Sequence, residues 1–264
     1  MTRRAAGTVG LMVLVVGMVA GDEVRARPSR DVLFQVSTID ALMAGLYDGR
    51  LALGQLRRHG DFGLGTLTAL DGEMVAVDGR FYQVTSDSVA HRVAPSQTTP
   101  FAAVTFFDRD QSATVKPGMT LVELQARLDR DLPSANWFYA IRIDGTFRIV
   151  KTRSVPRQQR PYRRLVDVVA EQPTYEFHDV AGTLVGFRCP YFVKSVNVPG
   201  YHFHFLTADR ARGGHVLDCV TEAAVAWLDT TPELHLALPD EEEFRCANLG
   251  PAQAGELEKV EKDR

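Results

Sequence analysis

Three histidines in the last third of the chain have the spacing of a metal site. His202 and His204 stand one residue apart in the segment YHFHF, and His215 follows the double glycine of TADRARGGH. Residues i and i+2 of a strand project from the same face, roughly 6 to 7 Å apart along the chain, so the first two imidazoles can converge on one ion. The segment TADRARGG is typical of a chain reversal that would return His215 beside them. Three neutral imidazoles without a thiolate are typical of an open catalytic zinc site, although other divalent metals also accept imidazole.

The H-x-H spacing also opens the cupin motif, in which a glutamate follows within a few residues as the next ligand. No glutamate follows His204 closely. This departure argues against a cupin. A cupin-like metal oxygenase and a non-catalytic exported zinc-binding protein nevertheless stay as alternatives to a zinc enzyme of another kind. The remaining histidines have no partner at ligand spacing and are expected at the surface or in hydrogen bonds: His59, His91, His178 and His235.

The composition is that of an ordinary globular protein. The chain has 264 residues and a formal net charge of -3, and 45% of its residues are hydrophobic. A chain of this length can bury a core without metal or disulfides, so a metal would serve function rather than folding. The slight acidity and the scattered arginines argue against a nucleic-acid partner.

The first residues have the order of a secretory signal peptide. Arg3 and Arg4 precede an apolar run that ends near Ala20 and small residues. A membrane anchor is the alternative, but a spanning helix needs roughly 20 apolar residues and this run is shorter. We therefore expect a cleaved signal peptide at 1–21, a linker at 22–31, export to the periplasm or the medium, and no membrane contact after cleavage.

Three cysteines are an odd set for an exported protein, because an oxidising compartment favours pairing and one thiol must be left over. Cys189 and Cys219 lie in apolar, strand-like segments, and Cys246 lies near the C-terminus. Their spacing matches neither a zinc ribbon nor a thioredoxin-type pair. We predict buried free thiols that take no part in catalysis.

Strands must position the histidines, and Asp-Gly pairs mark their turns. Such pairs occur at 71–72, 78–79 and 144–145, each between alternating or apolar runs. Asp-Gly is a strong hairpin signal because type I′ turns need positive φ. The third hairpin would deliver Arg153 at the end of its second strand.

Two helices are indicated before residue 135. In the first, STIDALMAGLYDG, Ser37 or Thr38 provides a cap. In the second, PGMTLVELQARLDRDL, Thr120 and Glu123 have capping-box spacing.

The pattern predicts an α+β fold dominated by β structure. The polar, arginine-rich segment RSVPRQQRPYRR is typical of an inter-domain connection. We therefore expect two domains, a mixed β-sheet with helices at 32–165 and an antiparallel β-sheet or barrel at 166–264. The second domain would carry the metal site and end in a short helix or tail.

Three longer segments together resemble the α-acetolactate decarboxylase family. They are HGDFGLGTLTALDGEMVAVDGRFYQV, NWFYAIRIDGTFRIVKTRSV and GTLVGFRCPYFVKSVNVPGYHFHFLTADRARGGHVLDC. The resemblance runs from about Leu33 to the C-terminus. It implies a zinc enzyme that converts the small molecule (S)-2-acetolactate to (R)-acetoin and CO2, a two-domain, mostly β fold, and a homodimer.

The resemblance also implies roles for individual residues. The metal ligands would be His202, His204 and His215. Glu73 matches the glutamate of the LDGE segment, and Arg153 matches the arginine that precedes SV. A glutamate of the C-terminal tail is matched best by Glu261, with Glu258 and Glu256 as alternatives.

The implied chemistry needs an electron sink. Acetolactate is a β-keto acid, and its loss of CO2 leaves an enediolate whose charge a Lewis-acidic zinc can stabilise without an organic cofactor. Arg153 could hold the departing carboxylate in a bidentate pair. Glu73 and Glu261 could complete the metal sphere or carry a proton, and either role is open to either residue.

Overall fold

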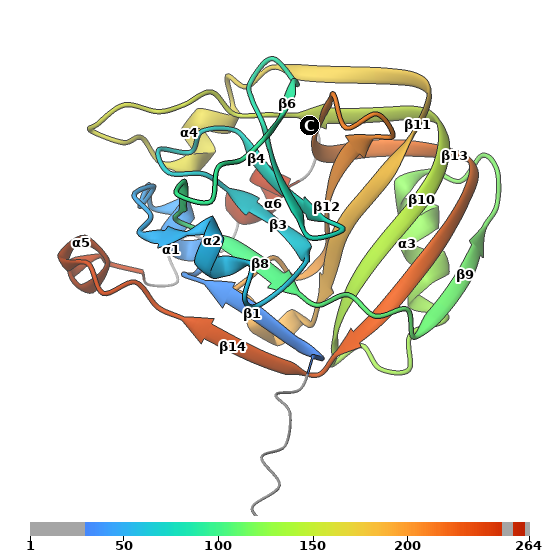
Figure 1. Ribbon diagram of the computed structural model, residues 1–264, viewed down its shortest axis with the longest axis horizontal. Helices are drawn as coiled ribbons and strands as arrows, with labels where there is room; N and C mark the ends of the chain where they lie inside the picture. The colour runs from blue at the N-terminus through green and yellow to red at the C-terminus, as the bar shows by residue number, and fades with distance from the viewer. Residues whose placement is uncertain (1–29, 250–255, 262–264) are drawn as a thin grey trace, which may run out of the picture.

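The protein is built mainly from β-strands, and the predicted β-dominated fold is confirmed (Figure 1). The computed structural model describes residues 30–249 and 256–261. The predicted signal peptide at 1–21 and most of the linker at 22–31 lie outside the described residues. Within the described part, no helix combines the length and apolar character needed to cross a membrane.

The first sheet has seven strands in the order β14-β1-β8-β3-β4-β5-β6. They are β1 (Val32–Val36), β3 (Phe62–Thr66), β4 (Glu73–Val77), β5 (Arg80–Val84), β6 (Ala90–Arg92), β8 (Ala102–Thr105) and β14 (Glu233–Ala237). The pairing of β14 with β1 is parallel and the others are antiparallel. Figure 1 shows β14, from the end of the chain, running beside the N-terminal β1. Two short strands, β2 (Leu51–Ala52) and β7 (Thr98–Thr99), pair separately.

The second sheet closes on itself. It contains β9 (Gln111–Val115), β10 (Phe138–Arg153), β11 (Thr174–Cys189), β12 (Gly200–Thr207) and β13 (Gly213–Thr231). Both β10 and β12 pair with β11 on one side and β13 on the other, all antiparallel. These four long strands therefore form a closed ring, to which β9 adds along β13. The antiparallel barrel predicted from the alternating segments is present.

The helices are short, and the two that were predicted before residue 135 begin where the sequence indicates. Helix α3 (Leu121–Asp129) has the predicted capping box: the Thr120 hydroxyl accepts from the Glu123 N–H, and the Glu123 carboxylate accepts from the Thr120 N–H. Helix α1 (Ile39–Met43) is capped by Thr38. The others are α2 (Leu53–Leu56), α4 (Leu165–Val169), the 3-10 turn η1 (Tyr191–Val193), α5 (Glu242–Cys246) and α6 (Glu256–Glu261).

Two of the three predicted Asp-Gly turns are present, and the prediction of the third, at 144–145, is wrong. The pair at 78–79 has positive φ at both residues and joins β4 to β5, and Gly72, at φ +76, lies in the turn before β4. The pair at 144–145 lies inside the continuous strand β10. A Cβ on Gly145 would stand 2.2 Å from the carbonyl oxygen of Ala223 on β13. This glycine permits close strand approach, which is the other common reason for glycine in a strand.

The expected boundary at residue 165 does not coincide with the division between the sheets. Strands β9 and β10 precede it but belong to the second sheet, whereas β14 follows it and pairs with β1. The segments 32–165 and 166–264 therefore each contribute to both sheets. The arginine-rich segment between them connects β10 to α4.

The side chains of β12 contribute to two hydrophobic clusters, one inside the second sheet and one between the two sheets. Leu206 packs with Leu33 and Val75 of the first sheet, whereas Phe203 and Phe205 pack inside the cluster formed by the closed ring and α3. Alternation along the strand then turns His202 and His204 to the same side as Leu206, toward the first sheet. The side chains of these histidines thus project from the second sheet into its junction with the first sheet.

The cysteines are free, as predicted, but the predicted burial holds for only two of them. Cys189 and Cys219 are buried and Cys246 is exposed. Burial raises the pKa of each buried thiol to about 12, so both are held as unreactive thiols.

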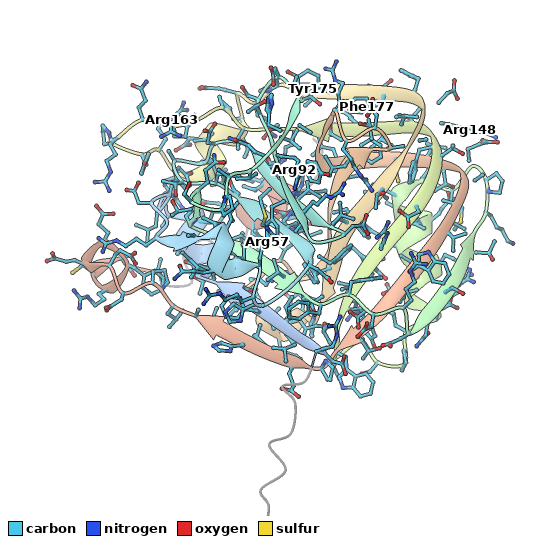
Figure 2. The ribbon with its side chains drawn as sticks, in the orientation of Figure 1. Arg57, Arg92, Arg148, Arg163, Tyr175 and Phe177 are labelled. Atoms are coloured by element: carbon cyan, nitrogen blue, oxygen red, sulfur yellow. The ribbon has the colours of Figure 1, made fainter. Side chains whose placement is uncertain are left out.

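Charged side chains are dispersed over the surface. Figure 2 shows Arg148 and Arg163 at opposite edges of the molecule, and each is paired locally, with Glu222 and Glu171 respectively.

Candidate metal and catalytic site

The structure brings the three histidines of the sequence pattern together. His204 on β12 lies directly opposite His215 on β13, and His202 stands two residues before His204 on the same face. Their ring centroids are 4.8 to 5.4 Å apart. Candidate ligand nitrogens of all three lie within 4.8 Å of one another. The chain reversal predicted from TADRARGG is what sets this register. The other four histidines are exposed, as expected.

The double glycine allows β13 to approach its neighbours closely. A Cβ on Gly213 would stand 2.1 Å from the carbonyl oxygen of Phe205, and one on Gly214 would stand 2.6 Å from that of Arg153. Gly214 also has φ +150, at the edge of the range that favours glycine. Larger residues at these positions would push His215 away from both β12 and Arg153.

Backbone contacts orient the imidazoles. His204 Nδ1 lies 2.9 Å from the carbonyl oxygen of Met74, which can only accept, so Nδ1 carries the proton and Nε2 presents its lone pair to the site. His202 Nε2 lies 3.1 Å from His215 Nδ1. His202 Nδ1 and His215 Nε2 are buried without a hydrogen-bond partner. Such orphaned nitrogens are costly unless something binds them.

All three imidazoles are held neutral. Burial lowers the pKa of His202 to about 3, and the charge of Arg153 acts in the same direction. Burial also places the pKa values of His204 and His215 well below the usual range. Neutral imidazole is the form that coordinates metal ions.

Two carboxylates approach the histidines from opposite ends of the chain. Glu73 begins β4, and its Oε2 lies 3.5 Å from His204 Nε2. Glu261 ends α6, and its Oε2 lies 3.8 Å from the Nε2 atoms of both His202 and His215.

Of the three tail glutamates considered from the sequence, the structure places Glu261 at the site. Glu256 instead forms a two-point pair with Arg164 at the surface. Glu258 is exposed.

Arg153 is buried at the end of β10, only 4% exposed, and therefore is no surface charge. Its Nη1 donates to Gln172 Oε1 at 3.1 Å, and its Nη2 donates to the carbonyl oxygen of Val260 at 2.9 Å. The nearest carboxylate oxygen, Oε1 of Glu73, is 3.7 Å from Nη1. The Nε atom is buried without a partner.

The two glutamates titrate near neutrality. Burial raises the pKa of Glu73 to about 7, although Arg153 opposes the shift. Burial likewise raises the pKa of Glu261 to about 7, again against Arg153. The site can therefore hold carboxyl protons at a pH where ordinary glutamates are ionised.

One cavity connects these groups. Its polar lining is Thr66, Glu73, Arg153, His202, His204, His215 and Glu261, and its apolar lining is Ile39, Leu42, Leu70, Phe101, Val155, Leu165 and Val260. The apolar residues come mostly from α1, α4, α6 and loops. Together with Gln172, they carry no spacing signal in the sequence, and only the folded chain brings them together.

Comparison with known proteins decides the family. Residues 33–251 match the family model described as alpha-acetolactate decarboxylase. The chain belongs to the alpha-acetolactate decarboxylase family. The resemblance noted in the sequence is thereby confirmed.

Individual members of the alpha-acetolactate decarboxylase family align over most of the chain. The protein of that name from Methanosarcina mazei is 52% identical over 88% of this chain and 81% of its own. The one from Methylococcus capsulatus is 46% identical, with 87% and 88% covered. A crystal structure of the Bacillus subtilis strain 168 alpha-acetolactate decarboxylase superposes with a TM-score of 0.86 at 40% identity, and covers 88% of this chain and all of that one. The chain is accordingly an enzyme of the carboxy-lyase class.

The residues of this family member fit a divalent metal ion. The candidate ligand nitrogens of the three imidazoles lie within 4.8 Å of one another, so one nitrogen from each ring can converge on one ion. The donor set is three neutral imidazoles with carboxylates beside them, and the buried Nε2 of His215, 3.8 Å from Glu261 Oε2, has no hydrogen-bond partner. The hydrogen bond from His204 to Met74 supplies the outer support that metal-bound histidines usually have.

Proposed function

We propose that the protein is a zinc-dependent acetolactate decarboxylase that converts (S)-2-acetolactate to (R)-acetoin and CO2. The observation that carries the proposal is the convergence of three buried neutral imidazoles and a buried arginine on one cavity. A metal site and an anion site then lie side by side, as a hydroxy-keto carboxylate requires. Membership of the family supports the same substrate.

His202, His204 and His215 would hold the ion. When bound, zinc supplies Lewis acidity for the hydroxyl and keto oxygens, which lowers the cost of the negative charge that forms as CO2 departs. Zinc is the expected ion because the donor set contains imidazole and carboxylate but no thiolate.

Arg153 would bind the substrate carboxylate. Its Nη atoms are fixed by Gln172 and Val260, and Nε is left without a partner in the buried site. A guanidinium fixed in this way can hold the carboxylate so that the breaking bond lies parallel to the π system of the neighbouring carbonyl. In that alignment the electron pair of the bond between C1 and C2 passes into the keto group.

One glutamate would add a ligand to the metal, and the other would deliver a proton to the substrate. Glu261 Oε2 is equally distant from two imidazole nitrogens, the position of a further ligand. Glu73 lies between Arg153 and His204, beside the place where C2 would lose its carboxylate. We therefore assign to Glu73 the delivery of a proton to C2, from one side, which fixes the handedness of acetoin.

Anaerobic turnover tests this function against its alternatives. The zinc-loaded protein is incubated without dioxygen with racemic acetolactate, and acetoin and CO2 are measured. We expect one enantiomer of acetoin and an equal amount of CO2, with His204→Ala as a control that lacks a ligand. Product that forms only with dioxygen would indicate the cupin-like oxygenase. Zinc bound at one equivalent without any product would indicate the non-catalytic zinc protein.

Metal analysis tests the zinc assignment separately. We expect about one zinc per chain, with the content reduced in each of three single variants: His202→Ala, His204→Ala and His215→Ala. Full zinc content in all three at an unchanged circular dichroism spectrum would place the metal elsewhere.

We further propose export and a homodimer. The order of arginine, apolar and small residues in the leader supports cleavage after 1–21. N-terminal sequencing of protein recovered outside the cytoplasm should start near residue 22, and an intact Met1 on active cytoplasmic protein would rule export out. Sedimentation of the mature protein should give twice the mass of one chain.

A further inference from the structure

The hydrogen-bond partners of Arg153 are both uncharged. Nη1 donates to the side-chain amide oxygen of Gln172 at 3.1 Å, and Nη2 donates to the main-chain carbonyl oxygen of Val260 at 2.9 Å. The amide orientation is fixed because a guanidinium can only donate, so the oxygen of Gln172 must face it. Buried arginines elsewhere are usually paired with carboxylates, since an uncompensated buried charge is costly.

The nearest carboxylate does not replace these partners. Glu73 Oε1 is 3.7 Å from Nη1, beyond hydrogen-bond distance, and has no hydrogen-bond partner of its own. Arg153 is therefore hydrogen-bonded by two neutral acceptors, and its salt bridge to Glu73, at 3.7 Å, is too long to include a hydrogen bond.

Gln172 reaches Arg153 from the connection between α4 and β11. It follows α4 and stands two residues before Thr174, which pairs with Arg153 across β10 and β11. The Gln172 side chain is only partly exposed. The strand register thus fixes Arg153 opposite Thr174, and the Gln172 amide, two residues earlier, reaches the guanidinium from the connection before β11.

We propose that Gln172 is a positioning residue, which orients Arg153 by a hydrogen bond and, because it is neutral, leaves the arginine's charge for the carboxylate of the substrate. This inference rests on the proposed role of Arg153. A glutamate at position 172 would make the same contact with nearly the same shape but would compete with the substrate for the guanidinium. The choice of an amide over a carboxylate is what sets anion affinity.

The test compares an anionic ligand with a neutral one. The probes are 2-hydroxy-2-methylpropanoate, which has the carboxylate but no keto group to accept electrons, and 2,3-butanediol, which has the hydroxyls but no carboxylate. Binding to the full-length zinc-loaded protein is measured by calorimetry. This binding measurement does not require turnover of acetolactate. If the protein should not turn acetolactate over, the proposed function fails, but the binding data still decide the role of Gln172.

The variants are Gln172→Glu and Gln172→Met, with Gln97→Glu as the matched control. Gln97 is exposed, and its amide oxygen also accepts one hydrogen bond, from Ala94, but it lies outside the site lining. We expect Gln172→Glu to weaken the carboxylate probe at least tenfold with no change for the diol. Gln172→Met, which loses the acceptor without adding charge, should weaken binding of the carboxylate probe about threefold. Gln97→Glu should change neither.

Two results would overturn the inference. One is carboxylate binding in Gln172→Glu equal to that of the wild type at equal zinc content. The other is an equal loss for both probes, which would indicate general damage to the site. If Gln172→Glu should not fold, unchanged carboxylate binding in Gln172→Met would overturn it equally.

Discussion

Burial decides the charge state of the individual residues in the site. The same loss of solvent that holds the three imidazoles neutral raises the pKa values of Glu73 and Glu261 to about 7. Arg153 keeps its charge because a guanidinium does not lose its proton in proteins. The protein thus presents one fixed positive charge beside neutral metal ligands, which suits an anionic substrate that must also chelate a cation.

Replacing Arg153 with lysine should separate charge from geometry. Lysine keeps the positive charge but has no planar fork, so the carboxylate would still be attracted but held in poor alignment. We expect kcat to fall roughly 10- to 100-fold, the equivalent of one charged hydrogen bond, with a smaller change in KM. Steady-state kinetics at equal zinc content measure this. A kcat equal to that of the wild type would remove Arg153 from catalysis.

Site residues could be predicted from the sequence where they lie close together along the chain. His202 and His204 share a strand face by the period of two, and the glycines before His215 indicate the return, so their convergence follows from local rules. Glu73, Arg153 and Glu261 were found only through the family resemblance. Gln172 gave no signal at all, because its contact with Arg153 depends on the register of β10 against β11.

At the scale of elements, the long strand β10 connects two of the other long strands of the second sheet. It pairs over its whole length with β11 and with β13, and it ends at Arg153. At Gly145 the neighbouring strand leaves no room for a side chain: a Cβ there would stand 2.2 Å from the Ala223 carbonyl oxygen and 2.6 Å from the Cβ of Ala224.

We expect Gly145→Ala to lower the free energy of unfolding by about 2 kcal/mol or more, because β13 would have to move away and take its hydrogen bonds with it. The control is Thr146→Ala, the exposed neighbour on the same strand, which loses only a long hydrogen bond of 3.4 Å to the Ala223 carbonyl oxygen and should lower stability by at most about 1 kcal/mol. Urea unfolding of both variants measures the difference. Equal stabilities would mean that the strands have room at this point.

The same glycine shows why one element was predicted wrongly. Asp-Gly favours a hairpin when nothing else acts on the two residues, and this holds at 78–79, where both have positive φ. At 144–145 the pairing of β10 with two neighbours keeps the backbone extended. Long-range pairing overrides a local turn signal, and no local pattern records it.

At the scale of the whole molecule, the chain crosses between the sheets near Asp229. The connection from β8 to β9 carries Asp108 and Asp110, and Asp229 lies near the end of β13, before the chain returns to the first sheet at β14. Asp229 is fully buried. Its Oδ2 accepts from the Asp108 N–H, and its Oδ1 has no hydrogen-bond partner. The two connections between the sheets, β8 to β9 and β13 to β14, thus bury a carboxyl group where they meet. The domain boundary expected from the sequence did not indicate these connections.

Asp229 should make stability depend on pH. Burial raises its pKa to about 7, with a smaller contribution from Asp110, Asp31 and Asp108, although the Asp108 N–H opposes the shift. The folded protein then keeps a proton that the unfolded chain releases, so stability should fall as pH rises from about 4 to about 7 and level off above. The loss attributable to this group is at most about 4 kcal/mol.

The variant Asp229→Asn keeps an acceptor for the Asp108 N–H but cannot ionise. Its stability relative to the wild type should therefore rise across the same pH window and be greatest above pH 7. Urea unfolding of both zinc-loaded proteins at a series of pH values gives this difference, in which the titration of the shared site groups cancels. A difference that stays constant from pH 4 to 9 would show that Asp229 is already ionised in the folded protein, and that the crossing between the sheets accommodates its charge.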